Sequence, residues 1–565
     1  MRHQTAGIKP SRSGWASPAA LVGAVAVGLL LYFCVLPLAL LVKHSFQGGD
    51  PFASYRLVAS RAANWSALKG TLTVASGAAA IAFLLGVPLG WLVAATDLPG
   101  ARSWRSLLAL PYVVPAYIGA VGWTYLLSDR AGWLNRLLTE GLGAPALPVS
   151  IYSLEGIIFI EGVFFSPFVL MAVAEAVERI DPALEEAARV SGAGPVRVWL
   201  DVTWPMVRRA ALGGALLAFL GTCASYGVPA VLGPSARPPV SVLTTRIKGY
   251  IDLHTTGGFR QATALSAVLL LAALAFPLAE RTSGSDSRSA GSRPAGRKPV
   301  ALGRWRTAAL AGVGAVFGLT TFLPILALLI SSLMENVGRG FSWENLSLVH
   351  YWVVLRRPEA GLALRNSFLL AASAATLAVG VGGTLALMQA RGGLRWGWVL
   401  TPLAWLPYAA PGTVLAIGAI LAYTGAWGIN LYGTLWMLLA AYAAKYLALA
   451  YRMAAAGIEQ VHPSMEEAAR ISGASRLRSI LEVLVPMVRG HLVAAWFLVF
   501  MPSFGELTMS ILLFGPDTPT LGTMLFELQS YEDPSAASVL AVLIVAVILL
   551  SNALVRRLSG GRYGI

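Results

Sequence analysis

Charged residues are scarce in this 565-residue sequence. Asp, Glu, Lys and Arg make up 12% of it, whereas 56% of its residues are hydrophobic. A soluble domain has about a quarter of its residues charged, which keeps its surface solvated. The shortage excludes an ordinary soluble globular chain and predicts that most of the protein lies in a lipid bilayer.

Residues that form disulfides or bind metals are also few. The two cysteines, Cys34 and Cys223, each stand alone inside an apolar run, where a thiol behaves as a small hydrophobe. The histidines are scattered, with no pair at metal-ligand spacing. We therefore expect no disulfide framework and no metal site, and we interpret the histidines as packing or interfacial residues: His3, His44, His254, His350, His462 and His491.

The chain also lacks a glycine-rich loop ending in Gly-Lys-Ser/Thr, whose backbone amides and lysine would hold nucleotide phosphates. We therefore expect that it is not an enzyme and binds no cofactor, and that any ATP is bound by a separate partner subunit. No soluble block of basic and aromatic residues is present, so a nucleic-acid partner is not expected.

What the sequence does contain is about twelve apolar runs of the length, about 20 residues, that crosses the hydrocarbon of a bilayer. The first is too long for the core of a signal peptide and is interpreted as a retained span. The predicted fold class is an all-α polytopic membrane protein. The runs lie near 18–43, 70–95, 106–128, 152–174, 210–233, 261–279, 307–331, 365–389, 397–423, 430–451, 491–514 and 536–555.

The cations predict the orientation of these spans. If the N-terminus is cytoplasmic and the spans alternate, the cytoplasmic segments hold 27 of the 42 Lys and Arg but 13 of the 27 Asp and Glu. The net charge of +15 therefore follows the bias of Lys and Arg to the cytoplasmic side. Both termini are predicted to be cytoplasmic.

The chain repeats itself. Pro182 to Arg208 aligns without a gap onto Pro463 to Arg489 with 16 of 27 positions identical, and the stretch starting at Leu110 (LPYVVP) corresponds to the one starting at Leu406 (LPYAAP). The first copy carries 15 extra residues, placed in the outward loop around Arg130 to Ser150. Six spans per half give two parallel repeats: a first transmembrane domain at 1–279, a flexible cytoplasmic linker at 280–304 rich in Ser, Gly, Pro and Arg, and a second domain at 305–565.

The repeated segment predicts a short cytoplasmic helix in each half. In the first copy Asp181 can cap a helix that Pro182 begins, and Glu185 and Glu186 lie in its first turns, where negative charge favours the helix dipole. Gly192 follows where a helix ends in a left-handed residue. The alternative is a solvated loop made of good helix formers, but such a loop tolerates almost any polar sequence, and this one is duplicated. The second copy repeats the plan with Pro463, Glu466, Glu467 and Gly473.

These residues resemble a family signature. Glu186-Ala187-Ala188 with Gly192, and Glu467-Ala468-Ala469 with Gly473, are similar to the EAA-x-x-x-G motif of permease subunits of binding-protein-dependent ABC importers. The resemblance implies that the loops at about 178–209 and about 459–490 dock onto two copies of a cytoplasmic ABC ATPase subunit. It also implies an extracytoplasmic solute-binding protein and a bacterial cytoplasmic (inner) membrane. The expected ATPase-coupling residues are Glu185, Glu186, Ala187, Ala188, Gly192, Glu466, Glu467, Ala468, Ala469 and Gly473.

Ionisable residues inside predicted spans are costly and point to function. Glu161, Lys445 and Glu506 are such residues, and Glu506 follows a break at Pro502 and Gly505. A cross-half ion pair between Glu161 and Lys445 is one reading, and local satisfaction of each is another. The candidate substrate pathway comprises Glu506, Glu161 and Tyr226.

The stretches from Tyr226 to Gly233 and from Gly505 to Thr508, with two permease domains in one chain, resemble the ferric-iron branch of the family. Ferric iron is the expected substrate, with thiamine, polyamine, sulfate or phosphonate as alternatives. An ion-coupled secondary transporter is the alternative from another class. The outward loops at Pro234 to Gln261 and Gly515 to Ser535 are expected to meet the binding protein.

Overall fold

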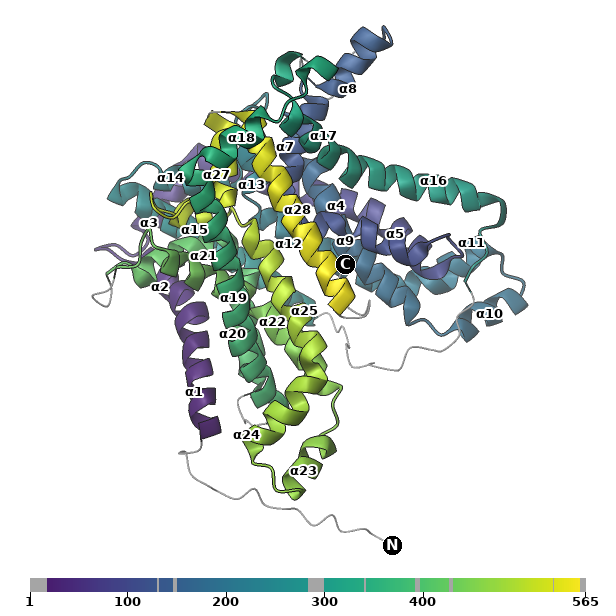
Figure 1. Cartoon of the computed structure of the whole chain (residues 1–565), viewed down its shortest axis with the longest axis vertical. Coiled ribbons are helices and arrows are strands. Elements are labelled where there is room, and N and C mark those ends of the chain that lie inside the picture. The colour runs from purple at the N-terminus through teal and green to yellow at the C-terminus, as the bar shows by residue number, and fades with distance from the viewer. Residues whose placement is uncertain are drawn as a thin grey trace.

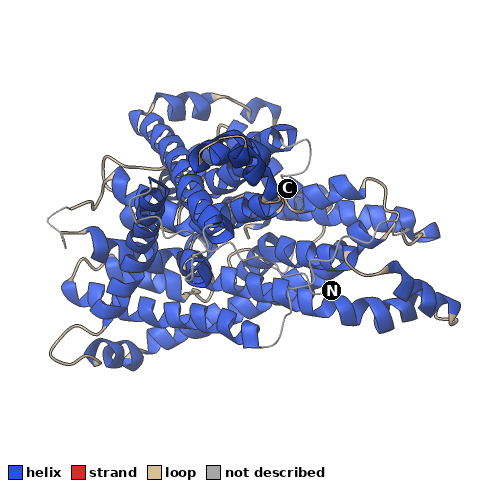
Figure 2. Cartoon of the chain, turned by 90° about the horizontal axis from the view of Figure 1, so that it is seen from below, coloured by secondary structure: helices blue, strands red, loops and turns tan. Residues whose placement is uncertain are grey.

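The structure, a computed structural model, describes residues 18–129, 132–145, 150–282, 299–339, 342–391, 397–425, 430–531 and 533–558. Over these ranges the chain is built from helices joined by loops, without a β-strand (Figure 2). This confirms the all-α polytopic fold class. Most of the predicted linker, 283–298, lies outside the described residues, as does His3. The part of the predicted insertion that is described forms α8 (Trp133–Arg136) and a π-helical turn, η2 (Leu137–Gly141).

Within the described ranges, nine helices are long and apolar enough to cross a membrane, or up to eleven if each of two bent pairs counts as one span. The pairs are Ala101–Val113 with α7 (Ala116–Leu127), bent by 96°, and Val399–Ala409 with α21 (Gly412–Tyr423), bent by 106°. The nine are Leu21–Ser45 (in α1, η1 and α2), Ala62–Ala95 (α4), Leu154–Glu178 (α9), Pro195–Ala224 (α11, η3 and α12), Thr256–Leu274 (in α15), Gly303–Leu333 (η4, α16, η5 and α17), Pro358–Arg391 (α19), Arg476–Phe504 (α24, η8 and α25) and Pro534–Leu558 (α28).

Each predicted run therefore falls on a helix or a bent pair. The run at 430–451 lies in α22 (Leu435–Glu459), which is not among the nine and which carries Lys445 and Arg452. For two of the predicted runs, the expected C-terminal end of the helix is wrong. The runs 210–233 and 491–514 are interrupted, because α12 ends at Ala224 and α25 at Phe504, and short helices, α13 (Gly227–Leu232) and α26 (Ser510–Leu513), follow.

Inside each half, the long helix packs closely against the helix before the repeated loop. A Cβ on Gly86 of α4 would lie 2.5 Å from Cβ of Val169 on α9, and a Cβ on Gly382 of α19 would lie 2.8 Å from the backbone nitrogen of Tyr451 on α22. Small residues let helices approach closely in a membrane, where packing replaces the hydrophobic effect as the driving force. The two glycines are 296 residues apart, the offset of the LPYVVP and LPYAAP stretches, so both halves use the same contact.

The first membrane-spanning helix of each half packs against the other half. Pro37 of α2 (Leu36–Ser45) packs on Gly418 of α21, where a Cβ would lie 2.7 Å from the Pro37 carbonyl oxygen. Pro324 of α17 (Leu323–Leu333) packs in the same way on Gly122 of α7, at 2.4 Å. Tyr423 donates a hydrogen bond of 2.9 Å to the carbonyl of Tyr32, across the same junction. Each half is therefore held by a helix of the other.

Figure 1 shows the consequence for the overall shape. The bundle of α4, α9 and α12 (Trp204–Ala224) and the bundle of α19, α22 and α25 (Val485–Phe504) run apart from a common region. Near the far end of each bundle lies one short helix, α10 (Pro182–Val190) or α23 (Ser464–Ile471). The repeated sequence segments thus occupy the tips of two diverging arms.

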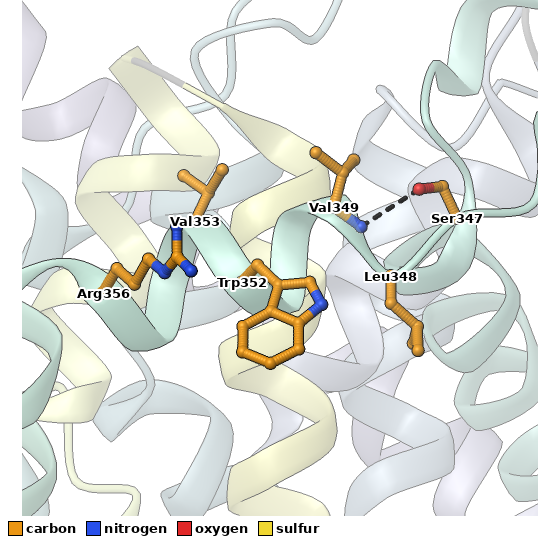
Figure 3. A pocket seen from close by; sticks show the side chains of 6 residues that line it. All are labelled: Ser347, Leu348, Val349, Trp352, Val353 and Arg356. Atoms are coloured by element: carbon orange, nitrogen blue, oxygen red, sulfur yellow. Dashed lines mark hydrogen bonds between the residues drawn. The ribbon is translucent and has the colours of Figure 1, made fainter.

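A pair of short helices marks the opposite side. α3 (Ala53–Ser60) and α18 (Val349–Arg356) are 296 residues apart and precede the long helices α4 and α19. Figure 3 shows α18, whose first N–H, from Val349, donates to the Ser347 hydroxyl and whose Trp352 and Arg356 line a surface pocket. Exposed tryptophan beside arginine is typical of a helix lying at a membrane surface.

The close helix contact gives a stability prediction. Gly382→Leu inserts a side chain against the α22 backbone and should destabilise the chain by about 1–3 kcal/mol, the usual cost of overpacking. Gly380→Leu is the matched control, because a Cβ at Gly380 of the same helix meets nothing within 4 Å. Thermal unfolding of the detergent-solubilised chain should show a lower midpoint for Gly382→Leu only. Equal midpoints for the two variants would contradict the packing argument.

Candidate functional site

The first repeated loop forms the helix that the sequence predicts. Asp181 caps α10 through its side chain, which accepts the N–H of Ala183 at 2.9 Å, and Pro182 is the first helical residue. The helix ends at Gly192, whose φ of +88° is the left-handed conformation that glycine adopts without strain. The N–H of Ala193 then donates to the carbonyl of Ala188 at 3.0 Å, closing the end of the helix.

Glu185 turns inward and fixes the loop to the transmembrane arm. Its side chain is 6% exposed, accepts the Thr203 hydroxyl at 3.0 Å and pairs with Arg189 at 3.2 Å. Thr203 belongs to a π-helical turn, η3 (Trp199–Thr203), at the start of the returning span. The carboxylate therefore joins α10 to the helix that re-enters the membrane.

The second loop has the same shape but a different anchor. Gly473 has a φ of +94° and Ala474 donates to the carbonyl of Ala469 at 3.0 Å, as in the first loop. Glu466, the counterpart of Glu185, pairs with Arg391 at the end of α19 at 2.8 Å, and both side chains are largely buried. Arg391 also donates to the carbonyls of Ile458 and Val461, where α22 ends. Arg391 thus ties α23 to two transmembrane helices at once.

Both loops expose apolar side chains at equivalent positions of the repeat. Glu186 and Glu467 are exposed, as are Ala187 and Ala468, whereas Ala188 and Ala469 are half-buried. Around them stand four large apolar side chains in each half, every one exposed and every pair 281 residues apart. This pattern is not among the predictions made from the sequence, although the repeat contains it: Leu184, Val190, Val196 and Leu200 match Met465, Ile471, Leu477 and Leu481.

A cavity of about 490 Å³ lies where the two arms meet. The LPYVVP and LPYAAP stretches at the bent pairs contribute to its wall, with α9 and α12 from the first half and α22 and α25 from the second. Tyr112 and Tyr408 occupy equivalent positions in the two stretches, and their phenols interact across the boundary between the halves. In the sequence these stretches serve only to align the repeats, and no site is predicted there.

The three predicted pathway residues do not line this cavity. Glu506 is buried, and its carboxylate accepts the N–H groups of Met509 and Ser510 and the Ser510 hydroxyl, so it caps the short helix α26. Glu161 on α9 is buried, and no ion pair joins it to Lys445 in the described part of the chain. Tyr226 directly precedes α13, with its ring centroid 6.2 Å from that of Phe526 in the other half. Their role in a pathway stays a prediction.

On the side of the cavity away from the loops, the two halves are in tight contact. Tyr117 of α7 donates to the carbonyl of Gly505 at 3.2 Å. A Cβ on Gly505 of the second half would lie 2.8 Å from Cγ of Pro115 of the first half. Pro115, Tyr117 and Gly505 thus form a close contact between the halves, here called the outer seal.

The different anchors of the two loops make a prediction. Arg391→Met should speed amide hydrogen exchange in α23 by about tenfold or more, because a hydrogen bond between charged groups contributes about 1.5–3 kcal/mol. Exchange in α10 should not change, since Glu185 has its own partners, Arg189 and Thr203. Hydrogen-exchange mass spectrometry of the full chain measures both loops in one sample. Unchanged exchange in α23, or equal acceleration in both helices, would contradict the assignment.

Known proteins are similar to this chain over one or both halves. The ferric transport system permease protein FbpB of Actinobacillus pleuropneumoniae is 24% identical over 546 residues, which cover 92% of this chain and 76% of that protein. The molybdenum transport system permease protein ModB of Escherichia coli K12 is 28% identical over 211 residues, 37% of this chain and 89% of that protein. A crystal structure of a bacterial alginate ABC transporter aligns with a TM-score of 0.37 and 17% identity, over 47% of this chain and 98% of that one.

A family model also matches each half separately, at residues 86–279 and 362–561. Each match contains one of the repeated loops together with the helices that carry it. The description of that model agrees with the resemblance that the EAA motifs indicate. The chain belongs to the family of binding-protein-dependent transport system inner membrane components, with two such domains fused in one polypeptide.

Proposed function

We propose that this ABC importer permease moves ferric iron from an extracytoplasmic binding protein to the cytoplasm by alternating access. The observation that carries the importer mechanism is the pair of loops, α10 and α23, with equivalent exposed residues at the tips of the two arms. Support for iron comes from the ferric permease of Actinobacillus pleuropneumoniae, which is similar over both halves rather than over one.

The loop surfaces support two ATPase partners for each chain. Val190 and Ile471 are 89% and 88% exposed, more than any other large apolar side chain in the described residues. An exposed apolar patch on a polar loop is typical of a protein-binding surface. Because the patch occurs twice, with Glu186 or Glu467 beside it, each loop can hold one copy of a cytoplasmic ATPase subunit.

The anchors explain how force would reach the cavity. Glu185 joins α10 to the start of α12 through Thr203, and Arg391 joins α23 to α19 and α22. When ATP draws two ATPase subunits together, the loops and the arms approach each other, which closes the cavity on the cytoplasmic side and loosens the outer seal. ATP binding shifts the equilibrium because the closed ATPase dimer favours one of the two arrangements of the arms.

In this proposal both termini and the 280–304 linker are cytoplasmic, and the binding protein meets the opposite side. There the predicted docking loops contain α14 (Leu243–Ile251) and α27 (Leu521–Tyr531). The same architecture serves permeases of other solutes, since the molybdenum permease and a 2-aminoethylphosphonate permease are each similar to part of the chain. Thiamine, polyamine, sulfate and phosphonate therefore stay as alternative substrates.

The coupling surface is tested by Val190→Asp combined with Ile471→Asp. Burying two carboxylates in the docking contacts should lower ATP-driven uptake at least tenfold, since an unpaired charge is costly to desolvate. The matched control exchanges the native residues, Val190→Ile with Ile471→Val, and should keep uptake near the wild-type level. Uptake of labelled ferric iron is measured in cells that lack the chain and are supplied with each variant, with membrane insertion checked by immunoblot.

The same assay separates the alternatives. Glu186→Arg combined with Glu467→Arg should also abolish uptake, because it reverses the charge on both loops. Restored uptake of thiamine, polyamine, sulfate or phosphonate in place of iron would keep the importer and replace its substrate. Uptake that survives all loop variants and collapses with the ion gradient would show a secondary transporter and overturn the proposal.

A further inference from the structure

The cavity between the arms differs in its two walls. α9 and α22 are related by the 281-residue offset, so Phe164 and Phe165 of the first half correspond to Lys445 and Tyr446 of the second. All four side chains line the cavity. At these positions one half contributes two phenyl rings, whereas the other contributes a cation and a phenol. A site with unlike walls can distinguish the two ends of a solute.

Lys445 is the charged side chain of this cavity. Its ammonium donates to the carbonyl of Tyr408 at 3.1 Å and to that of Ala410 at 2.5 Å, both at the bend between the Val399–Ala409 helix and α21. An ammonium has three N–H donors. Two are used by neutral carbonyls, which leaves one donor and the positive charge for a solute in the cavity.

No acidic side chain among the described residues that line the cavity is available to pair with Lys445. Among the described residues, those that line the cavity include no Asp, Glu or His. Glu506 interacts electrostatically with Lys445, but its carboxylate is outside the lining and is taken up by the N–H groups of Met509 and Ser510 and by the Ser510 hydroxyl. A solute in the cavity therefore meets the ammonium of Lys445 before it meets any carboxylate.

The volume of the cavity also favours an anionic solute over a bare metal ion. A volume of about 490 Å³ lies in the range of sites for small molecules, about 300–1,000 Å³, and far exceeds a bare metal ion. A bare trivalent cation prefers a shell of hard oxygen ligands, which an apolar wall with one ammonium does not supply. A solute that brings its own oxygens, with a net negative charge, fits both the volume and the charge.

We propose that the solute occupying this cavity is an anion, either a small oxyanion or a ferric ion held in a negatively charged chelate, with Lys445 as its charge partner. The assignment of the cavity to the transport path rests on the proposed function. Tyr112, Tyr408 and Tyr446 also line the cavity and bring hydroxyl groups to it, and Phe164 and Phe165 would contact the less polar end of the solute.

The aromatic walls raise a competing possibility, because cations bind the faces of aromatic rings. Thiamine and polyamines would use that interaction. Lys445 already lies 5.8 Å from the centroid of the Tyr408 ring, so a second cation there would be repelled. The position of the ammonium favours an anion, and an organic cation is the occupant that the test must exclude.

The test compares Lys445→Met with Lys445→Arg and with Lys69→Met. The last is the matched control, since it removes the same charge from an exposed lysine of α4 that does not line the cavity. The purified full-length chain in lipid nanodiscs is titrated by calorimetry with four probes: ferric citrate, molybdate, thiamine and spermidine. Ferric citrate and molybdate represent the two sources of negative charge, and the assay needs no ATPase, so its outcome does not depend on the coupling proposal.

We expect at least one of the two anions to bind the wild-type chain, with Lys445→Met weakening it about tenfold or more, as for loss of a charge-assisted hydrogen bond. Lys445→Arg and Lys69→Met should change that affinity by less than about threefold. Binding of thiamine or spermidine without either anion, absence of anion binding to the wild type, or equal anion binding by Lys445→Met and the wild type would each overturn the inference.

The importer proposal is tested separately by uptake with the loop variants. If uptake is ATP-driven and is lost in those variants, but Lys445→Met binds anions as tightly as the wild type, the anion inference alone fails. If Lys445→Met weakens anion binding but the loop variants take up the solute as fast as the wild type, the coupling proposal alone fails. The two results are therefore distinguishable.

Discussion

A lipid bilayer offers no hydrogen bonds to a polypeptide backbone, and this constraint decides where the helices of the protein can break. The bend before α21 frees carbonyls at Tyr408 and Ala410, and Lys445 of α22 donates to both. The break after α25 frees N–H groups at Met509 and Ser510, and Glu506 accepts them. Two buried ionisable side chains thus make the irregular backbone at the centre of the molecule stable.

These breaks shape the cavity between the halves and the contact beside it. A straight helix in place of the bent pairs would not bring Tyr112 and Tyr408 to the boundary between the halves. The seal of Tyr117 against Gly505 also depends on α25 ending there. Cavity, seal and arms are therefore parts of one arrangement, in which Lys445 both satisfies the backbone and presents its charge to the cavity.

The two halves keep the same outline while their details differ. Glu185 and Glu466 occupy the same place in the repeat, yet one pairs with Arg189 and Thr203 and the other with Arg391. Both solutions hold a loop whose outer face is conserved between the halves in size and polarity. What the duplication preserves is the surface that faces outward, and what has diverged is the means of supporting it.

Much of this was predictable from local sequence. The length of the apolar runs predicts the helices, and Asp181, Pro182 and Gly192 predict the start and end of α10 because capping depends on neighbouring residues. The partner of Glu466 was not predictable, since Arg391 lies 75 residues away and its proximity depends on how α19 packs against α22. The cavity was missed for the same reason, because its wall combines residues of both halves. Apolar residues such as Val190 look like ordinary helix residues until the structure shows that nothing in the described chain covers them.

The central claim is that the chain carries two equivalent docking loops, α10 and α23, each of which binds one ATPase subunit. Its most direct test is the number of ATPase subunits that bind to one chain. Native mass spectrometry of the complex, purified with the ATPase subunit encoded for the same transporter, should give two ATPase copies for each wild-type chain. Val190→Asp and Ile471→Asp singly should each weaken one of the two contacts and so give species with one copy. A single copy on the wild type, or two copies held firmly by the Val190→Asp and Ile471→Asp double variant, would contradict the account.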